Sequence, residues 1–182
     1  LHRQGWAAPN WPVEYGGPDW STRQVVAFAD ECESNFCPPL PNFGIGMIGP
    51  LLMTYGNQAQ KDFFLEKTRT GEFQWCQGYS EPGAGSDLAL LKTRAVLEDG
   101  HYVVNGAKIW TSEAHHADWM FCLVRTDPEA AKKQDGISML LIDMTTPGIT
   151  IRPIIGLNGI HYFNEIFFDD ARVKAENLIG EQ

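Results

Sequence analysis

The second half of the chain consists of short apolar runs separated by turn-forming dipeptides, and this pattern constrains the fold more than any other feature. Residues 73–77 alternate between apolar and polar side chains, as a half-buried strand does. Asp99-Gly100 and Asn105-Gly106 are strong hairpin signals, so we expect each of them to join two strands. Short strands at this spacing are typical of an antiparallel β-barrel or sandwich. The other expected strands cover residues 92–97, 101–104, 108–111, 120–124, 137–142, 149–153 and 165–168.

The first part of the chain has helical periodicity instead. Apolar residues recur at helical spacing between Val25 and Cys32, after a Ser21–Gln24 pair that predicts a capping box. A second helix is expected over residues 45–55, ending at Gly56, and Asn57 is expected to cap a third over residues 58–68, closed by Gly71. We therefore predict an α+β chain with a partial helical domain over residues 1–72 and a β-domain over residues 73–182.

Charge and composition exclude several classes of protein. The chain has 182 residues and a formal net charge of −9, from 14 basic and 23 acidic residues, which argues against a general nucleic-acid or anionic-membrane surface. No apolar run approaches the length of a membrane span, and the start lacks a signal-peptide pattern and a Met. We expect a cytoplasmic protein, of which this chain begins at an internal residue. The four cysteines and five histidines show no metal-ligand spacing, so no metal site is predicted.

The segment Gly78–Ala89 concentrates hydroxyls, two carboxylates and small residues between extended stretches. Gly83 and Gly85 would let a ligand approach the main chain, and Pro82-Gly83 suits a type II turn. Ser80 and Ser86 can donate and accept hydrogen bonds. By itself such a segment is also typical of an exposed hairpin tip. A dinucleotide-binding loop is disfavoured, because no βαβ unit surrounds the glycines.

A second segment, Asn105–Ser112, combines a turn with a strand that ends in Trp110, Thr111 and Ser112. Together the two segments resemble the acyl-CoA dehydrogenase family of flavoenzymes, and the stretches 118–127 and 163–170 fit the same family in the same order. The resemblance covers the chain from about Gly5 to Gln182. It implies helices followed by a central β-barrel, with the family's C-terminal helical bundle missing from this chain.

The resemblance implies FAD as cofactor and assigns roles to individual residues. Ser80 is expected near the pyrimidine edge of the flavin, Trp110 over one face of the ring system, and Ser112 with its hydroxyl towards flavin N5. Ser86 is expected where the pyrophosphate and the CoA ester approach each other, so that it also binds substrate. The full set of cofactor-binding residues predicted in this way is Gln77, Tyr79, Ser80, Gly85, Ser86, Trp110, Thr111 and Ser112.

Each of these residues also has an ordinary structural interpretation. Trp110 could be a core aromatic of a barrel strand, and Ser80 could cap the turn. We interpret Glu81 and Asp87 as structural, because ionised carboxylates are poor phosphate ligands, and His115-His116 as a solvated turn. The sequence departs from the common family pattern at Tyr79, Leu90 and Glu113, which puts the redox tuning and the substrate in doubt more than flavin binding.

The predicted activity is α,β-dehydrogenation of an acyl-CoA thioester to the 2-enoyl-CoA, with electrons passed to an electron-transferring flavoprotein. The catalytic base, a carboxylate in the family's C-terminal bundle, has no counterpart in this chain, so the chain alone is expected to be inactive. Homo- or hetero-oligomers, dimers or tetramers, are expected for the full-length protein. The alternatives are a non-catalytic subunit of a heteromeric dehydrogenase, an oxidase or flavin monooxygenase on the same fold, or a β-domain that binds a different ligand.

Overall fold

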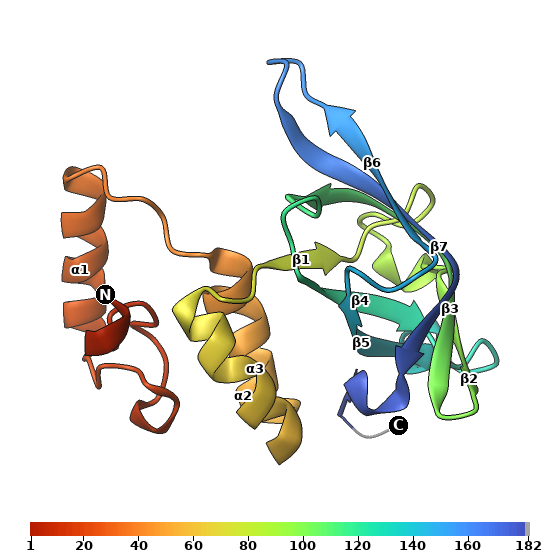
Figure 1. Cartoon of the computed structure of the whole chain (residues 1–182), viewed down its shortest axis with the longest axis horizontal. Helices are drawn as coiled ribbons and strands as arrows, with labels where there is room; N and C mark the ends of the chain where they lie inside the picture. The colour runs from red at the N-terminus through yellow and green to blue at the C-terminus, as the bar shows by residue number, and fades with distance from the viewer. Residues whose placement is uncertain (181–182) are drawn as a thin grey trace. The chain divides into compact units, whose positions relative to one another are not determined.

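The computed structural model describes residues 1–180, and the chain divides into two compact units, Leu1–Gln74 and Trp75–Gln182. Figure 1 shows helices in the first unit and a twisted sheet in the second. The predicted α+β class, with a helical segment followed by a mostly antiparallel β-domain, is confirmed. No helix within residues 1–180 is both long enough and apolar enough to cross a membrane.

The first unit contains three α-helices, and the expected cap residues begin two of them. Helix α1 spans Thr22–Ser34 and α3 spans Gln58–Thr70; Ser21 with Gln24, and Asn57 with Gln60, form complete capping boxes. Gly71 closes α3 in a left-handed conformation, as predicted. Shorter helical elements are η1 (His2–Gln4), η2 (Val13–Tyr15), the π-helix η3 (Phe43–Ile48) and the α-helix α2 (Gly49–Tyr55).

The single helix predicted over residues 45–55 is wrong in its first half. The chain forms the π-helix η3 and changes to α-helical geometry only at Gly49, the residue before Pro50. Pro50 has no N–H to donate to the preceding turn, which favours a break in the hydrogen-bond ladder at this point. The Trp11 indole N–H donates to the Ile45 carbonyl over 2.9 Å and fixes the wide turn. Gly56 ends α2 with an extended backbone.

The second unit is one eight-stranded sheet in the order β6-β7-β3-β2-β4-β5-β8, with β1 paired to β4. Two pairings are parallel, β1 with β4 and a single residue pair between β2 and β4. Strands β6 and β7 form a hairpin that extends beyond the other strands (Figure 1). The strands are β1 (Trp75–Gly78), β2 (Arg94–Glu98), β3 (His101–Ser112), β4 (Trp119–Arg125), β5 (Ile137–Asp143), β6 (Ile149–Ile155), β7 (His161–Lys174) and β8 (Leu178–Ile179).

One hydrophobic core holds the sheet together. Val104 on β3 and Ile166 on β7 belong to the same buried cluster as Cys122 on β4 and Leu140 on β5. Partly buried apolar residues of β6 and β8 pack against the same cluster, so both ends of the sheet cover one interior, as the predicted barrel or sandwich requires. Burial raises the pKa of the Cys122 thiol to about 11, so that this cysteine is a neutral core residue at physiological pH.

The two hairpin signals have different outcomes. Asp99 and Gly100 both have positive φ, 49° and 75°, and join β2 to β3 in the expected two-residue turn. Asn105-Gly106 is not a turn, because β3 runs through it without interruption. The pairing of β3 with β7 shifts between Val104 and Gly106, which marks a β-bulge. The Asn105 amide donates to Asp170 of β7 over 2.9 Å, so this polar side chain pairs across the sheet.

We predict that Gly106→Ala destabilises the fold by about 2–4 kcal/mol, from backbone strain and overpacking together. Gly106 has a φ of +147°, and a Cβ at this position would lie 2.6 Å from the Thr93 Cα. Urea unfolding of the full-length protein measures the effect. The matched control is Gly83→Ala, where a Cβ meets no atom within 4 Å; it should change stability by less than about 0.5 kcal/mol. If the two variants were equally stable, the β-bulge would not require a glycine at position 106.

Candidate functional site

The Gly78–Ala89 segment is anchored by a buried ion pair that the sequence alone did not predict. The Lys108 ammonium lies 2.9 Å from a Glu81 carboxylate oxygen, and their side chains are 0% and 8% exposed. The same ammonium donates to the Tyr79 carbonyl over 3.1 Å. The Glu81 carboxylate also accepts the main-chain N–H groups of Lys92 and Thr93 at 2.6 and 2.9 Å. Three donor groups therefore converge on one carboxylate of the loop.

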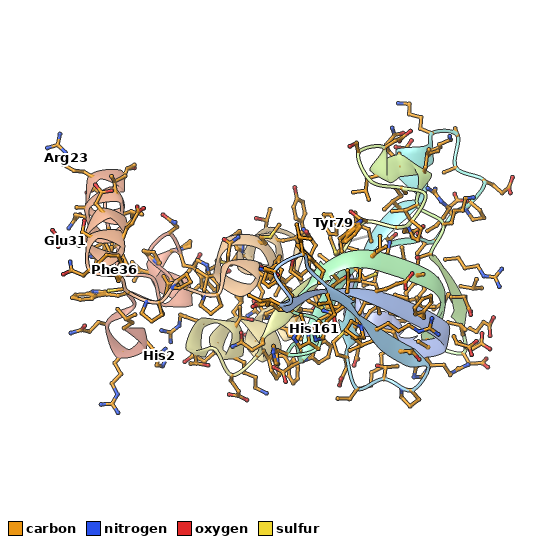
Figure 2. The ribbon with its side chains drawn as sticks, turned by 90° about the horizontal axis from the view of Figure 1, so that it is seen from above. His2, Arg23, Glu31, Phe36, Tyr79 and His161 are labelled. Carbon is orange, nitrogen blue, oxygen red and sulfur yellow. The ribbon has the colours of Figure 1, made fainter. Side chains whose placement is uncertain are left out.

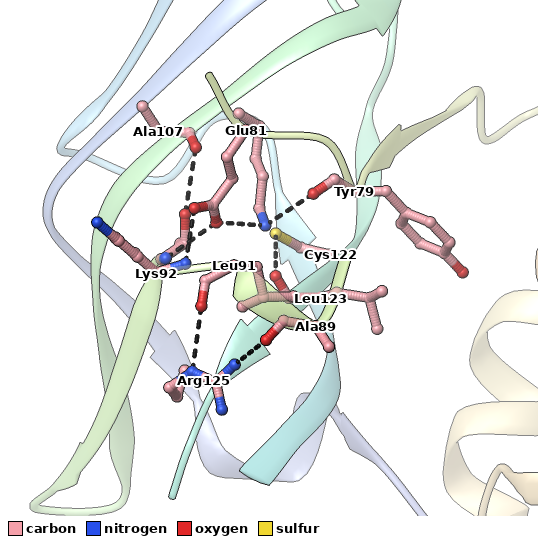
Figure 3. Close-up of polar contacts among 11 residues, drawn as sticks. Tyr79, Glu81, Ala89, Leu91, Lys92, Ala107, Cys122, Leu123 and Arg125 are labelled. Atoms are coloured by element: carbon pink, nitrogen blue, oxygen red, sulfur yellow. Dashed lines mark hydrogen bonds and ion pairs between the residues drawn. The ribbon is translucent and has the colours of Figure 1, made fainter. Parts of the chain in front are cut away.

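These contacts favour the ionised form of the Glu81 carboxyl group. Burial by itself would raise the pKa of the Glu81 carboxyl, but the hydrogen bonds from Thr93, Lys92 and Lys108 and the Lys108 charge outweigh it and hold the pKa below its usual value. Figure 3 shows the carboxylate directed into this cluster of donors, with the Tyr79 ring pointing away from it. The interpretation of Glu81 as a structural residue agrees with this geometry, since three groups of the protein itself bind the carboxylate.

The turn that follows Glu81 differs from the expected type. Glu81 and Ala84 exchange two main-chain hydrogen bonds of 2.9 and 3.0 Å around Pro82-Gly83. Gly83 is not among the residues with positive φ, whereas a type II turn requires positive φ at this position. The type II prediction is therefore wrong. The exchanged pair of hydrogen bonds and the Glu81 anchor fix the turn without a left-handed glycine.

Arg125 holds the far end of the same loop. Its guanidinium donates to the carbonyls of Ala89 and Leu91 over 2.8 and 3.1 Å (Figure 3). It also donates to the Lys133 carbonyl over 3.0 Å. Ala89 belongs to the short 3-10 helix Leu88–Leu90 that ends the loop. A basic residue next to apolar strand residues, as Lys108 is within β3 and Arg125 at the end of β4, is the sequence signal that could have indicated these anchors.

A main-chain hydrogen bond joins the two predicted motifs. The Ile109 N–H donates to the Ser80 carbonyl over 2.8 Å, so residues 79–80 run beside the last part of β3. The structure therefore brings Ser80 next to the Trp110–Ser112 stretch. Of the predicted site residues, Gln77, Tyr79, Ser80 and Ser112 are half-buried, Gly85 and Ser86 are exposed, Trp110 is exposed and Thr111 is buried.

Trp110 occupies an unusual position for a large aromatic residue. Its side chain is 56% exposed and its φ is +61°, a conformation that costs a non-glycine residue about 1–3 kcal/mol. It lies where the pairing of β3 with β7 shifts, between Lys108 and Thr111. The Phe163 ring of β7 meets it edge to face, with centroids 5.9 Å apart. The alternative of an ordinary core aromatic is wrong, because the ring projects from the strained strand towards the surface.

Thr111 and Ser112 differ in where their hydroxyls lie. Ser112 is half-buried at the end of β3, opposite Phe163. Thr111 is 1% exposed, and among residues 1–180 its Oγ1 is one of two buried side-chain polar atoms without a hydrogen-bond partner. A buried hydroxyl without a partner costs stability, which is more typical of a functional segment than of a purely structural strand.

His115-His116 lies in a turn, as predicted, and His116 is exposed, but the half-buried His115 ring packs against β7. The His115 ring stacks on His161 of β7 with centroids 3.8 Å apart and an interplanar angle of 18°. Asn164, fully buried on β7, contacts both rings: its amide nitrogen lies 3.1 Å from His115 Nδ1 and its carbonyl oxygen 2.7 Å from His161 Nε2. His161 and Tyr79 both lie in the second unit (Figure 2). Asn164 is a residue that motif reasoning did not single out.

The arrangement suits a planar ring ligand held by few polar groups. An exposed indole, two serine hydroxyls and a turn with open space above Gly83 and Gly85 lie on connected strands and loops. Ordinary packing requires neither the unpartnered hydroxyl nor the strained, exposed indole. Within residues 1–180, no group of three or more His, Cys, Asp and Glu side chains is placed to hold a metal ion.

Comparisons with known proteins agree along the whole chain. Residues 1–72 match the family described as "Acyl-CoA dehydrogenase, N-terminal domain", and residues 76–171 match "Acyl-CoA dehydrogenase, middle domain". The chain is 44% identical over 181 residues to "Acyl-CoA dehydrogenase IpdE1" of Mycobacterium tuberculosis (strain ATCC 25618 / H37Rv), covering 99% of this chain and 47% of that protein. The chain thus spans about half the length of this relative.

Solved structures show the same similarity. The crystal structure of the ChsE4-ChsE5 complex from Mycobacterium tuberculosis superposes with a TM-score of 0.90 at 40% identity, over 100% of this chain and 46% of that one. The structure of the Tcur3481-Tcur3483 steroid ACAD superposes with a TM-score of 0.91 at 36% identity, also over 100% and 46%.

We predict that Lys108→Met destabilises the protein by about 3–5 kcal/mol, because it leaves the Glu81 charge buried without its cation. Thermal or urea unfolding of the full-length protein measures the loss. The double variant Lys108→Met/Glu81→Gln should recover part of it, since the uncompensated charge is then absent. Lys92→Met is the control: its side chain is exposed, and only its main-chain N–H bonds to Glu81. If Lys108→Met lost no more stability than Lys92→Met, the ion pair would not be what holds the loop.

Proposed function

Because the chain belongs to the acyl-CoA dehydrogenase family, we propose that the full-length protein is an FAD-dependent dehydrogenase that converts an acyl-CoA thioester into the 2-enoyl-CoA. The observation that carries the proposal is Trp110, an exposed indole on a strained strand end, hydrogen-bonded through its neighbour Ile109 to the Ser80 segment. When bound, FAD would supply a hydride acceptor for the β carbon of the acyl group, and a carboxylate base outside this chain would take the α proton. The residues of this chain would bind FAD and the acyl-CoA thioester and orient them for the reaction.

Ser80, Trp110 and Ser112 are proposed to contact the flavin ring. The half-buried Ser80 hydroxyl would donate to the pyrimidine edge, where a hydrogen bond stabilises negative charge on the reduced ring. The Trp110 indole would cover one face, for which its exposure is a requirement. The Ser112 hydroxyl would lie towards N5. The pairing with β7 and the hydrogen bond from Ile109 to Ser80 favour a fixed geometry for this segment, as hydride transfer demands.

The remaining predicted site residues are proposed to hold the other parts of the cofactor and the substrate. Gln77, on β1, and Tyr79, the first residue after β1, are proposed to lie beside the flavin. Thr111 is proposed to bind the cofactor through its main chain, because its side chain is buried. Gly85 and Ser86, both exposed, would bind the pyrophosphate, and Ser86 also the CoA ester. The main chain is accessible here, since a Cβ at Gly85 would meet no atom within 4 Å.

The catalytic base is proposed to lie outside this chain. Glu81 is the buried carboxylate of the Gly78–Ala89 loop, but Lys108 and two main-chain N–H groups bind it. It is therefore unsuited to accept a proton from the substrate. The isolated 182-residue chain is therefore expected to be inactive. Electrons would pass to an electron-transferring flavoprotein, and the protein would act in the cytoplasm.

Assembly with a second, non-identical subunit is a specific form of this proposal. Two of the similar structures are named after a pair of proteins each, ChsE4-ChsE5 and Tcur3481-Tcur3483. In a pair of this kind one subunit can keep the fold without the base, so a non-catalytic subunit is the second candidate function. Since the second pair is named a steroid ACAD, steroid-derived CoA esters belong among the substrates to be tested.

Anaerobic titration of the full-length protein with acyl-CoA esters tests the activity. The panel should contain straight-chain, branched, dicarboxylyl, aromatic and steroid-derived esters, and the visible flavin absorbance is followed. Bleaching by one class is the expected result and would define the substrate class. A yellow protein that no ester bleaches would favour the non-catalytic subunit. A colourless protein that takes up no added FAD would contradict the proposed function.

We predict that Trp110→Ala weakens FAD binding by about tenfold to a hundredfold, the equivalent of losing one stacked aromatic ring worth about 1–3 kcal/mol. Its side chain is largely exposed, so the substitution should not lower the midpoint of unfolding of the apoprotein. The FAD dissociation constant is measured by flavin fluorescence. Leu97→Ala, an exposed apolar residue of β2 with a similar exposed fraction of 54%, is the control and should bind FAD as the wild type does. Unchanged affinity in Trp110→Ala would remove this residue from the site.

A further inference from the structure

Asn164 is the centre of a buried hydrogen-bond network behind the Trp110–Ser112 segment. Its amide nitrogen donates to the Thr111 carbonyl over 3.0 Å and lies 3.1 Å from His115 Nδ1. Its carbonyl oxygen lies 2.7 Å from His161 Nε2. All of these contacts lie within the second unit, between β7, the end of β3 and the turn after it. Asn164 is fully buried, so water cannot replace a lost partner without rearrangement.

The Thr111 carbonyl determines which way the Asn164 amide points. A carbonyl only accepts, so the group that faces Thr111 must be the NH2 group of Asn164. The amide oxygen on the opposite side then accepts a hydrogen bond from the N–H of His161 Nε2, and the second N–H of the amide donates a hydrogen bond to His115 Nδ1. It follows that His115 Nδ1 carries no proton. The network is complete only when His115 is the neutral tautomer with its proton on Nε2.

The surroundings of His115 favour this neutral form. Burial lowers the pKa of His115 below the ordinary value of 6.5, and repulsion from His116 and His161 lowers it further, while the Glu113 charge opposes the shift. The charged and titratable groups that face His115 are thus His116 and Glu113 on its own turn and His161 on β7. Because the folded pKa is depressed, the neutral network is intact above pH 6.5 and is lost as the pH falls through the folded pKa.

The network is connected directly to the segment proposed to contact the flavin. Asn164 pairs with Thr111 in the β3–β7 register, and its neighbour Phe163 pairs with Ser112. Phe163 also supports the Trp110 ring edge to face. Since the regular register is broken between Lys108 and Thr111, the Asn164 side chain supplies a hydrogen bond to the strand end just after the break.

We propose that His115, Asn164 and His161 are positioning residues that hold Trp110 and Ser112 in the geometry for flavin binding, and that this requires neutral His115. The inference rests on the proposed function, because it concerns the same site. Protonation of His115 Nδ1 places two N–H groups against each other, so the Asn164 amide must turn and release the Thr111 carbonyl. The site therefore loosens at acidic pH, although the side chains of His115, Asn164 and His161 are not among those proposed to bind the cofactor.

The test is the FAD dissociation constant of the full-length protein between about pH 8 and pH 5, with the flavin reduction potential as a second measurement. The wild type should bind FAD roughly tenfold more weakly at the acidic end, with the change centred below pH 6.5. His115→Asn keeps an acceptor near the position of Nδ1 but cannot be protonated, so it should keep tight binding and lose the pH dependence. His115→Phe keeps a ring for stacking but no acceptor, and should bind roughly tenfold more weakly at every pH.

Controls separate this inference from a general effect on folding and from the proposed function itself. His101→Asn, in the β2–β3 hairpin, should keep the pH dependence of the wild type. A purely structural role would lower the unfolding midpoint of His115→Phe while leaving its reduction potential unchanged, and would overturn the inference. FAD affinity independent of pH, or equal in His115→Phe and the wild type, would also overturn it and leave the proposed function standing. A protein that takes up no FAD would overturn both.

Discussion

The Lys108 ammonium lies in the interior of the β unit, and an interior charge persists only where its partners are fixed. Here the partners are the Glu81 carboxylate and the Tyr79 carbonyl, both in the loop that follows β1. The two further donors to Glu81 come from Lys92 and Thr93, just ahead of β2. One ion pair thereby joins the loop, the start of β2 and the middle of β3. The position of Ser80 depends on it, since Ser80 lies between the two residues that Lys108 contacts.

The end of β3 shows how a regular sheet can present a strained surface. The register break after Lys108 allows a positive φ at Trp110 and turns the indole outward, while Thr111 on the next position is buried. The cost of the strained residue is offset by contacts on both sides: Ile109 donates to Ser80, and Asn164 donates to Thr111. The loop anchored by Lys108 and the network centred on Asn164 therefore support the same three residues from two directions.

Sequence patterns predicted the elements well and the long-range contacts poorly. Asp99-Gly100 and Asn105-Gly106 carry the same turn signal, but only the first joins two strands; at the second, the packing of Thr93 against Gly106 and the pairing of Asn105 with Asp170 keep the strand continuous. The family resemblance already placed Ser80 and Trp110 in one site. Lys108 and Asn164 were missed because most of their partners are distant in the sequence: Glu81 lies 27 residues from Lys108, and Thr111 and His115 lie 53 and 49 residues from Asn164. No local periodicity encodes such distances.

The central claim is that the surface formed by Ser80, Trp110 and Ser112 receives the flavin ring. The most direct measurement is a crystal structure of the full-length protein with FAD bound. We expect the Trp110 indole against one face of the isoalloxazine, the Ser112 hydroxyl within hydrogen-bond distance of N5, and the Lys108–Glu81 pair intact beneath the loop. An isoalloxazine bound elsewhere, with Trp110 covered by another protein segment, would contradict the claim.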